Sequence, residues 1–459
     1  MKNSSFYQIA VDYLTLALKV GENFDAVKKE ITYKNKKGTL FLLTTLTSAT
    51  EVIAISESLI NCRMGKKPDY QLYNGSVSEE KDLKNLAKLV FSGVAILLLP
   101  ENEYALTIEV RNYPTKGISE PNAEKSVRGS KDGFTESIND NIGLLRRRVR
   151  DKNLKIELIT LGSKSKSDVA LVYLDGVGDK KTIDKIREKL NNIDINSLVM
   201  TSRALVEKIL PQRYNPFPLA RYTERPDIAS INLFQGKILL ICDTSPDVII
   251  LPITIFDHFQ DVEEYHQSPL VGSLTKIIRT LGIFLSVFLV PLWYILITET
   301  GINNYFILRP SKEVQMPLFL QIIIAELFVE LIRLAIVHAP SELTSSIGVV
   351  AAIILGSVTI ELDLFLPEVL VYVSFAAIAS FATPSYELSL ANRLIKVLLL
   401  TLCFLFGRLG FILGCIALFV FLVSKSVYGI SYLYPLIPFD RREALKIFYR
   451  DDASHKKTL

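Results

Sequence analysis

Cysteine and histidine, the residues that most often build metal and redox centres, are rare in this sequence, with four of each in 459 residues. The cysteines are far apart and form no CxxC pair: Cys62, Cys242, Cys403 and Cys415. This spacing predicts no disulfide framework and no zinc motif. His258 and His266 are eight positions apart, whereas a metal-binding HExxH helix needs histidines four apart. We therefore expect no metal site.

Sequence motifs of enzymes are also scarce. The chain has no GxxxxGK[ST] phosphate loop and no GxSxG element. GVGDKKT at 176–182 lacks the third glycine of a dinucleotide-binding loop, so we interpret it as a tight turn. The net charge of +4 does not indicate the concentrated basic face of a nucleic-acid binder. The sequence predicts a protein that is not an enzyme, needs no cofactor and has no nucleic-acid partner.

Charged residues are depleted in the second half of the chain. Between Thr280 and Val423 there are six Lys or Arg and nine Asp or Glu among 144 residues, about 10%, against 22% in the whole chain. This part contains five long apolar runs, at 280–297, 316–337, 343–360, 368–383 and 394–423. A helix that crosses a bilayer needs about 20 apolar residues. We expect a soluble region followed by an all-α, polytopic membrane domain.

The last apolar run is thirty residues long, more than one straight crossing needs. It is either one tilted helix or a hairpin of two short helices that breaks near 407–410. Basic residues favour the cytoplasmic side of a membrane. Nine of them mark that side: Lys276, Arg279, Arg393, Lys396, Lys425, Arg441, Arg442, Lys446 and Arg450. Acidic residues mark an outer loop: Glu361, Asp363 and Glu368. This pattern predicts five or six crossings, with the soluble region and the tail in the cytoplasm.

The first run ends close to Trp293 and Tyr294. Tryptophan and tyrosine are enriched where a helix meets the membrane surface. We therefore interpret these two side chains as interfacial anchors.

The first half of the chain alternates short apolar runs with charges. Residues 1–30 lack the apolar core of a signal peptide and have the pattern of an amphipathic helix. Strands are predicted at 38–48, 89–100, 104–111, 154–162, 168–177 and on both sides of a turn within 237–252, and helices at 138–149 and 180–193. This alternation predicts an α/β region of two small subdomains. We divide the chain into subdomains 1–112 and 113–275, a membrane domain 276–437 and a basic cytoplasmic tail 438–459.

Four arginines crowd the last turns of the helix predicted at 138–149: Arg146, Arg147, Arg148 and Arg150. Cations suit the C-terminal end of a helix because they oppose the helix dipole. We interpret the cluster as a solvated helix end that makes ion pairs. The alternative is a basic interface that binds phosphate, a partner protein or the anionic headgroups of membrane lipid.

The second apolar run carries three charges: Glu326, Glu330 and Arg333. Spacings of four and three residues place them on one helical face. Since a charge at the bilayer centre costs about 3 kcal/mol or more, this face is expected to point into the protein or a water-filled path. Three interpretations stay open: a structural ion pair that locks helices together, the lining of a path for ions or polar solutes, and an interfacial helix.

The end of the fourth apolar run is polar, with Pro384, Ser385 and Tyr386 followed by Glu387. This composition is typical of a broken helix whose backbone lines a cavity.

Arg408 lies in the middle of the last run, next to Gly407. It needs a carboxylate partner if it is buried, and the candidates are Glu326 and Glu387. Gly410 and Gly414 form a GxxxG pattern, which allows two helices to approach closely.

Several stretches together resemble one protein family: VRGSKDGFTESINDNIGLLRRRVRD at 127–151, NPFPLARYTERPD at 215–227, EEYHQSPLVGS at 263–273 and SFATPSYELSLANR at 380–393. They are similar to the A subunits of bacterial spore germination proteins, the GerA family, and the resemblance runs from about residue 38 to 437. DTSP at 243–246 replaces the DGTP-like turn of the nutrient-receptor A subunits. This difference favours a branch of the family formed by a sporulation protein.

The resemblance implies a multi-pass protein of the spore inner membrane that acts in germination as part of an oligomeric, pentameric ion channel. For the sporulation branch it implies a small membrane partner protein and amplification of the release of monovalent cations. For the receptor branch it implies partnership with a transporter-like B subunit and a lipoprotein C subunit. Three functions therefore remain: an ion-conducting subunit, a nutrient-receptor subunit that transduces a signal from a ligand-binding partner, and a scaffold without a pore.

Overall fold

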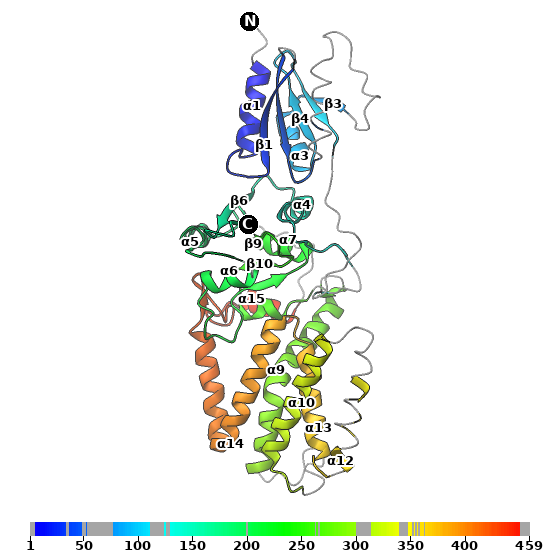
Figure 1. Ribbon diagram of the computed structural model, residues 1–459, viewed down its shortest axis with the longest axis vertical. Helices are drawn as coiled ribbons and strands as arrows, with labels where there is room; N and C mark the ends of the chain where they lie inside the picture. Colours follow the sequence, from blue (N-terminus) through cyan, green and yellow to red (C-terminus); the bar gives the residue numbers. More distant parts are fainter. Residues whose placement is uncertain are drawn as a thin grey trace. The chain divides into compact units, whose positions relative to one another are not determined.

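The computed structural model of the chain is shown in Figure 1. It describes residues 5–33, 36–47, 77–110, 129–198, 201–261, 267–299, 314–338 and 363–449, with the short pieces 52, 124, 263–264, 348–350, 353, 356 and 359–361. The chain divides into two compact units. The first holds Met1–Arg213 and Ala220–Pro252, and the second holds Tyr214–Leu219 and Ile253–Leu459.

The first unit begins with a five-stranded antiparallel sheet in the order β1-β2-β4-β5-β3. Its strands are β1 Ala26–Tyr33, β2 Lys36–Leu43, β3 Val77–Glu80, β4 Ala95–Leu98 and β5 Ala105–Ile108. Helices α1 Ser5–Ala17 and α3 Leu83–Phe91 complete this first subdomain.

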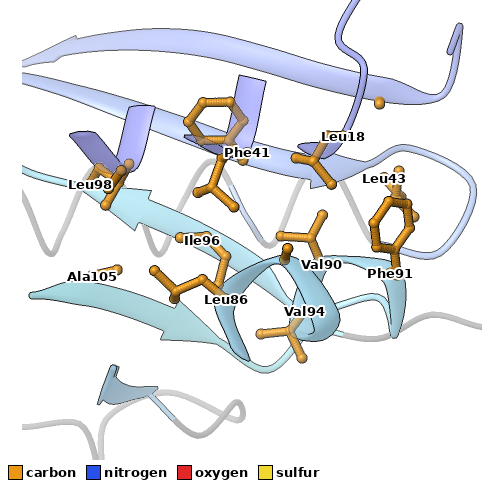
Figure 2. Close-up of a cluster of buried hydrophobic side chains, with 14 of the residues drawn as sticks. Leu18, Phe41, Leu43, Leu86, Val90, Phe91, Val94, Ile96, Leu98 and Ala105 are labelled. Carbon is orange, nitrogen blue, oxygen red and sulfur yellow. The ribbon is translucent and has the colours of Figure 1, made fainter. Parts of the chain in front are cut away.

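The apolar run in β2 is buried on both faces because successive side chains of a strand point to opposite sides. Phe41 and Leu43 enter the cluster to which α1 and α3 contribute, which Figure 2 shows. Leu40 and Leu42 pack into a second cluster. The first subdomain therefore has a core on each side of its sheet.

The second subdomain is another antiparallel sheet in the order β6-β7-β9-β10-β8. Its strands are β6 Leu154–Leu161, β7 Ser167–Leu174, β8 Arg221–Thr223, β9 Ile238–Cys242 and β10 Val248–Leu251. Its helices are α4 Ile138–Arg148, α5 Lys180–Asn191, α6 Thr201–Ile209 and α7 Pro226–Phe234. Helix α4 begins after Ser137, whose Oγ accepts a hydrogen bond from the Asp140 backbone.

Most strands and helices predicted for this half are confirmed, but two predictions need correction. The helix predicted within 1–30 ends at Ala17 because the chain turns at Gly21, whose φ is +91°, and β1 follows. The strand predicted at 89–100 is divided between α3 and β4. The predicted combination of strands and helices in this region is confirmed, and the sheets are antiparallel throughout the described residues. Alternation of strands and helices does not fix strand direction, and short turns between paired strands require antiparallel pairing.

Among the described residues, the second unit has four main helices: α9 Pro269–Glu299, α10 Leu318–His338, α13 Pro367–Phe381 and α14 Tyr386–Val423. Its smaller elements are η2 Ile255–Phe259, α12 Thr359–Glu361, β11 Ser426–Val427, β12 Ile430–Ser431 and α15 Arg441–Phe448. Within the described residues, α9 and α14 are long and apolar enough to cross a membrane, and α13 is a shorter apolar helix. The apolar run at 343–360 lies mostly outside the described residues.

Helix α14 is a hairpin of two arms. Gly407 has φ 58° and ψ −138°, which is not helical. A Cβ on Gly414 would lie 2.6 Å from Cδ2 of Leu399, although the two residues would be about 22 Å apart in a straight helix. The second arm therefore folds back along the first (Figure 1), and Gly410 and Gly414 line their contact. The hairpin interpretation of the 394–423 run is confirmed.

Helices α10 and α13 run in the same direction. Oε1 of Gln321, near the start of α10, accepts a hydrogen bond of 2.8 Å from the backbone N–H of Leu366, the N-cap of α13. Ile322 and Ala325 share a cluster with Val369 and Val373. The end of α10 at His338 therefore lies about 26 Å along the helix axis from the start of α13.

Trp293 is not an interfacial anchor. Only 1% of its surface is exposed, and its ring stacks on Tyr372 of α13 with centroids 4.5 Å apart. Tyr294 is also buried, and packs edge-on against Phe319 of α10. The interfacial prediction is wrong because these large rings fill the space between α9 and its neighbours, where they gain more contact area than at a surface.

Candidate functional site

The three charges of α10 lie on one face, as their spacing predicts, and this face meets the first arm of α14. Glu326 contacts Lys396, Glu330 contacts Arg393, and Arg333 contacts Tyr386. The numbering rises along α10 as it falls along α14, so the two helices are antiparallel. Polar and charged side chains thus connect two apolar helices.

The deeper pair is Glu326 with Lys396. Nζ of Lys396 lies 2.6 Å from both carboxylate oxygens, although only Oε2 has hydrogen-bond geometry. The lysine side chain is 3% exposed and the glutamate side chain 11%. The attraction between the two charges offsets part of the free energy that each loses when it leaves water, so both can be buried together.

The shallower group has two cations on one carboxylate. One oxygen of Glu330 accepts from Nη2 of Arg333, and the other accepts from Nη1 of Arg393 at 2.8 Å. Nη2 of Arg393 also donates to Oγ of Ser389 at 3.1 Å. The guanidinium of Arg333 lies 5.5 Å from the ring centroid of Tyr386, a cation–π geometry.

The charged network extends from the first residue of α14 toward the middle of the helix bundle. Tyr386 is the first residue of α14, and Lys396 lies ten residues further, about 15 Å along the axis. A bilayer hydrocarbon core is about 30 Å thick. If α14 crosses it, the network extends from one surface to the midplane.

Two further buried polar groups accompany these charges. Nδ2 of Asn392 and Oγ1 of Thr383 have no hydrogen-bond partner among the described residues. Asn392 is four residues before Lys396, on the same buried face of α14. Buried polar groups are normally satisfied by protein or by ordered water. This face is therefore suited to hold ordered water.

Arg393 and Lys396 are the residues that sequence reasoning missed. The charge pattern predicts a cytoplasmic loop at these two positions, but both residues lie inside α14 and pair with carboxylates of α10. A separation of three residues, like the separation of four between Glu326 and Glu330, places two side chains on the same face of a helix. Two faces of opposite charge on two apolar helices are the sequence pattern that indicates this pairing.

The segment with Pro384, Ser385 and Tyr386 does not interrupt a single helix. It joins α13, which ends at Phe381, to α14, which runs in the opposite direction. Ser385 caps α14 by accepting from the Leu388 backbone at 3.3 Å, and it donates to Glu387 at 3.1 Å. The broken-helix prediction is wrong because a capped turn satisfies the backbone here.

Arg408 is exposed, one residue past the bend at Gly407. Of its two expected partners, Glu326 binds Lys396 and Glu387 accepts from Ser385. Arg408 is thus not part of the charged network.

Arg146 is not part of a solvated basic interface. It is fully buried and forms two bonds of 3.0 Å with the equally buried Asp25 of the first subdomain. Its Nη1 also donates to the Leu154 carbonyl at 3.3 Å. Arg148 binds Asp132, and Nε of Arg150 donates to the Arg147 carbonyl. The expected ion pairs are present, but Arg146 forms an internal link between subdomains.

The chain after α14 returns to the end of the bundle at which α9 begins. Nζ of Lys276, in the third turn of α9, donates to the Lys446 carbonyl of α15 at 2.6 Å. Tyr432 donates to the Pro218 carbonyl at 2.8 Å and is fully buried. Burial raises the pKa of the Tyr432 hydroxyl, so it remains a donor at physiological pH. The described residues contain no group of three or more side chains that could hold a metal ion.

The model of a family described as Bacillus/Clostridium GerA spore germination protein matches residues 14–458. The chain belongs to the GerA family of spore germination proteins. The family resemblance expected from the motifs at 127–151, 215–227, 263–273 and 380–393 is confirmed.

Relatives with assigned names agree with this membership. Stage V sporulation protein AF of Bacillus subtilis (strain 168) is 36% identical over 96% of this chain and 91% of its own length. Spore germination protein KA of the same organism is 30% identical over 82% of this chain and 70% of its own length. The crystal structure of the N-terminal domain of the A subunit of the Bacillus megaterium spore germinant receptor GerK3 covers 52% of this chain and 92% of that domain, with 24% identity and a TM-score of 0.38.

Proposed function

We propose that this GerA-family chain is a multi-pass subunit of an oligomeric ion channel in the spore inner membrane, which releases monovalent cations and amplifies germination. The observation that carries the proposal is the network between α10 and α14, in which charges and unsatisfied polar groups line apolar helices. The similarity to a stage V sporulation protein supports a role in the spore. A small membrane partner protein is part of this proposal.

Helix directions support six crossings. Since α10 and α13 are parallel, the chain between them has to return from one end of the bundle to the other, which agrees with a crossing at 343–360. The α14 hairpin adds two crossings rather than one. The contact between Lys276 and Lys446 agrees with a topology in which both ends of the bundle sequence lie on one side of the membrane. An even number of crossings satisfies that arrangement.

This topology leaves the soluble subdomains and the tail on the same side, which we propose to be the cytoplasm of the spore core. The proposed divisions are 1–112, 113–275, 276–437 and 438–459. Residues 214–219 belong to the second compact unit although they precede β8.

Asn392→Leu tests the ion path because its effects on flux and on stability should differ. Removing an unsatisfied buried amide should leave stability unchanged or higher, while an apolar side chain should reduce cation flux by removing a hydrated site. The measurement is potassium and sodium efflux from liposomes that contain the full chain, alone and with its small membrane partner, together with thermal unfolding. Leu398→Ala, on the exposed side of the same arm, is the matched control.

The absence of flux from the wild-type chain under either condition would oppose the channel proposal. Full flux from both Asn392→Leu and Glu326→Gln would oppose this network as the ion path. Retained flux in these variants would leave the charges with a purely structural role. Only the absence of flux from the wild-type chain would favour a scaffold without a pore.

The alternative function is a nutrient-receptor A subunit that acts with B and C subunits and transduces a signal from a ligand-binding partner subunit. The similarity to spore germination protein KA favours it. Deletion of the gene separates the two functions. A receptor subunit should be needed for germination by particular nutrients only, whereas an amplifying channel should change the rate of germination with every nutrient.

A further inference from the structure

The charged network contains more positive than negative charge. Its described members are the carboxylates of Glu326 and Glu330 and the cations of Arg333, Arg393 and Lys396. Lys396 neutralises Glu326, and both arginines share the single charge of Glu330. One positive charge therefore has no counter-charge within the network.

Glu387 does not supply the missing negative charge. Its carboxylate accepts from Oγ of Ser385, and among the described residues it contacts neither Arg333 nor Arg393. Arg333 also retains unused bonding capacity, since its buried Nε has no hydrogen-bond partner among these residues. An unneutralised guanidinium in a surrounding of low dielectric constant is costly, and a bound anion removes that cost.

The position of Arg333 identifies the kind of anion. It lies five residues before the end of α10 and beside Tyr386, the first residue of α14. Tyr386 is 56% exposed, as expected for an aromatic side chain at the headgroup level. The unneutralised charge is therefore at the depth of lipid phosphates, and a guanidinium binds phosphate through two parallel N–H groups.

We propose that Arg333 and Arg393 bind a phosphate group at the end of α10, supplied by an anionic phospholipid of the adjacent leaflet. Glu330 holds both guanidiniums in place, and Tyr386 packs against the one with the free donor. The site rests on the membrane placement in the proposed function but not on ion conduction. A phosphate here would stabilise the closure of α10 on the first arm of α14.

The test uses the full chain purified in a nonionic detergent, with thermal unfolding as the readout. Phosphatidylglycerol, phosphatidylcholine with the same acyl chains, and inorganic phosphate are titrated separately. We expect phosphatidylglycerol to raise the unfolding temperature most. Arg333→Gln should weaken this response about fivefold, the factor that corresponds to roughly 1 kcal/mol for one basic residue near an anionic surface. This variant should fold because Arg393 still neutralises Glu330.

Arg442→Gln, an exposed arginine of α15, is the matched control and should keep the wild-type response. Arg333→Lys keeps the charge but loses the paired N–H groups, so it should respond at an intermediate level. Stabilisation by inorganic phosphate equal to that by the lipid, and lost in Arg333→Gln, would support the phosphate site but assign it to a soluble ion.

The proposal is overturned if neither phosphatidylglycerol nor inorganic phosphate stabilises the wild-type chain, or if Arg333→Gln responds as fully as Arg442→Gln. Liposomes that conduct cations while showing no such lipid response would reject this site alone. The failure of ion conduction with an intact lipid response would instead reject the channel.

Discussion

Lys396 and Glu326 form an ion pair between two helices whose sequences lie 70 residues apart, with Nζ 2.6 Å from both carboxylate oxygens. The pair is almost completely buried. Neither α10 nor the first arm of α14 could place its charge in an apolar bundle alone, since an isolated buried charge is costly. The opposite charges therefore favour the packing of α10 against the first arm of α14.

Exchanging the charges of this pair separates a structural role from a functional one. Glu326→Lys or Lys396→Glu alone places two like charges together and should destabilise the chain by about 3 kcal/mol or more. The double exchange should recover most of that loss. Thermal unfolding in detergent measures stability, and liposome efflux measures function. Recovery of stability without recovery of flux would show that conducted ions contact this pair. A double variant whose loss of stability equals the sum of the two single losses would contradict the pairing itself.

The buried pair of Asp25 and Arg146 should be essential for the docking of the first subdomain on the second. Asp25→Asn leaves the guanidinium of Arg146 buried without a counter-charge, and should cost about 3–5 kcal/mol. Urea unfolding of the full chain, followed by hydrogen exchange in β1 and β6, measures this loss. Arg150→Gln is the control, because Arg150 is exposed and should change stability by no more than about 0.5 kcal/mol. Equal effects of both substitutions would refute the link.

The two glycines of the α14 hairpin should differ in their tolerance of alanine. A Cβ on Gly410 would overlap the backbone carbonyl of Leu402, which cannot move away without opening the hairpin. A Cβ on Gly414 meets only the ends of the Leu399 and Leu402 side chains. Gly410→Ala should therefore cost about 3 kcal/mol and Gly414→Ala about 1 kcal/mol or less. Thermal unfolding of both variants tests the difference, and a straight α14 would instead make both substitutions harmless.

The second subdomain should lose one stabilising contact in acid. Arg187 binds both oxygens of Glu157, at 2.7 and 2.8 Å, and Tyr173 donates to the same carboxylate. Burial alone would raise the pKa of Glu157, but the hydrogen bonds from Arg187 and Tyr173 and the arginine charge hold this pKa below its ordinary value of 4.5.

Because the pKa of Glu157 is lower in the folded state than in the unfolded state, the contact stabilises the fold fully above about pH 4.5 and fades as the pH falls through the folded-state value. Arg187→Gln should therefore cost about 1 kcal/mol at pH 7, and this difference should shrink below pH 4.5. Urea unfolding at several pH values measures it. A difference that stays constant down to pH 3 would contradict the ion pair.

Several features could be predicted from residues that lie close together in the sequence. Strands such as β2 and β6 follow from apolar runs of strand length, and α4 follows from an apolar stripe behind a capping serine. The break in α14 follows from excess length together with glycine at 407. The single face of Glu326, Glu330 and Arg333 follows from helical spacing alone. Each of these depends on residues close together in the chain.

The partners of the charges could not be read in the same way. Arg146 looked like a solvated helix end because its role depends on Asp25, which lies 121 residues earlier. Trp293 looked interfacial because nothing local shows that Tyr372 stacks on it. Arg393 and Lys396 looked like loop markers because their carboxylates belong to α10.

The sequence by itself determined the family, the apolar helices, the strands and the presence of charges that a membrane environment does not tolerate alone. The tertiary structure decided which opposite charge each one meets, the antiparallel pairing of the sheets and the return of the second arm of α14. The physical reason is that helical and strand periodicity act over a few residues. Neutralisation of a buried charge, in contrast, depends on which segments the fold brings within about 3 Å of one another.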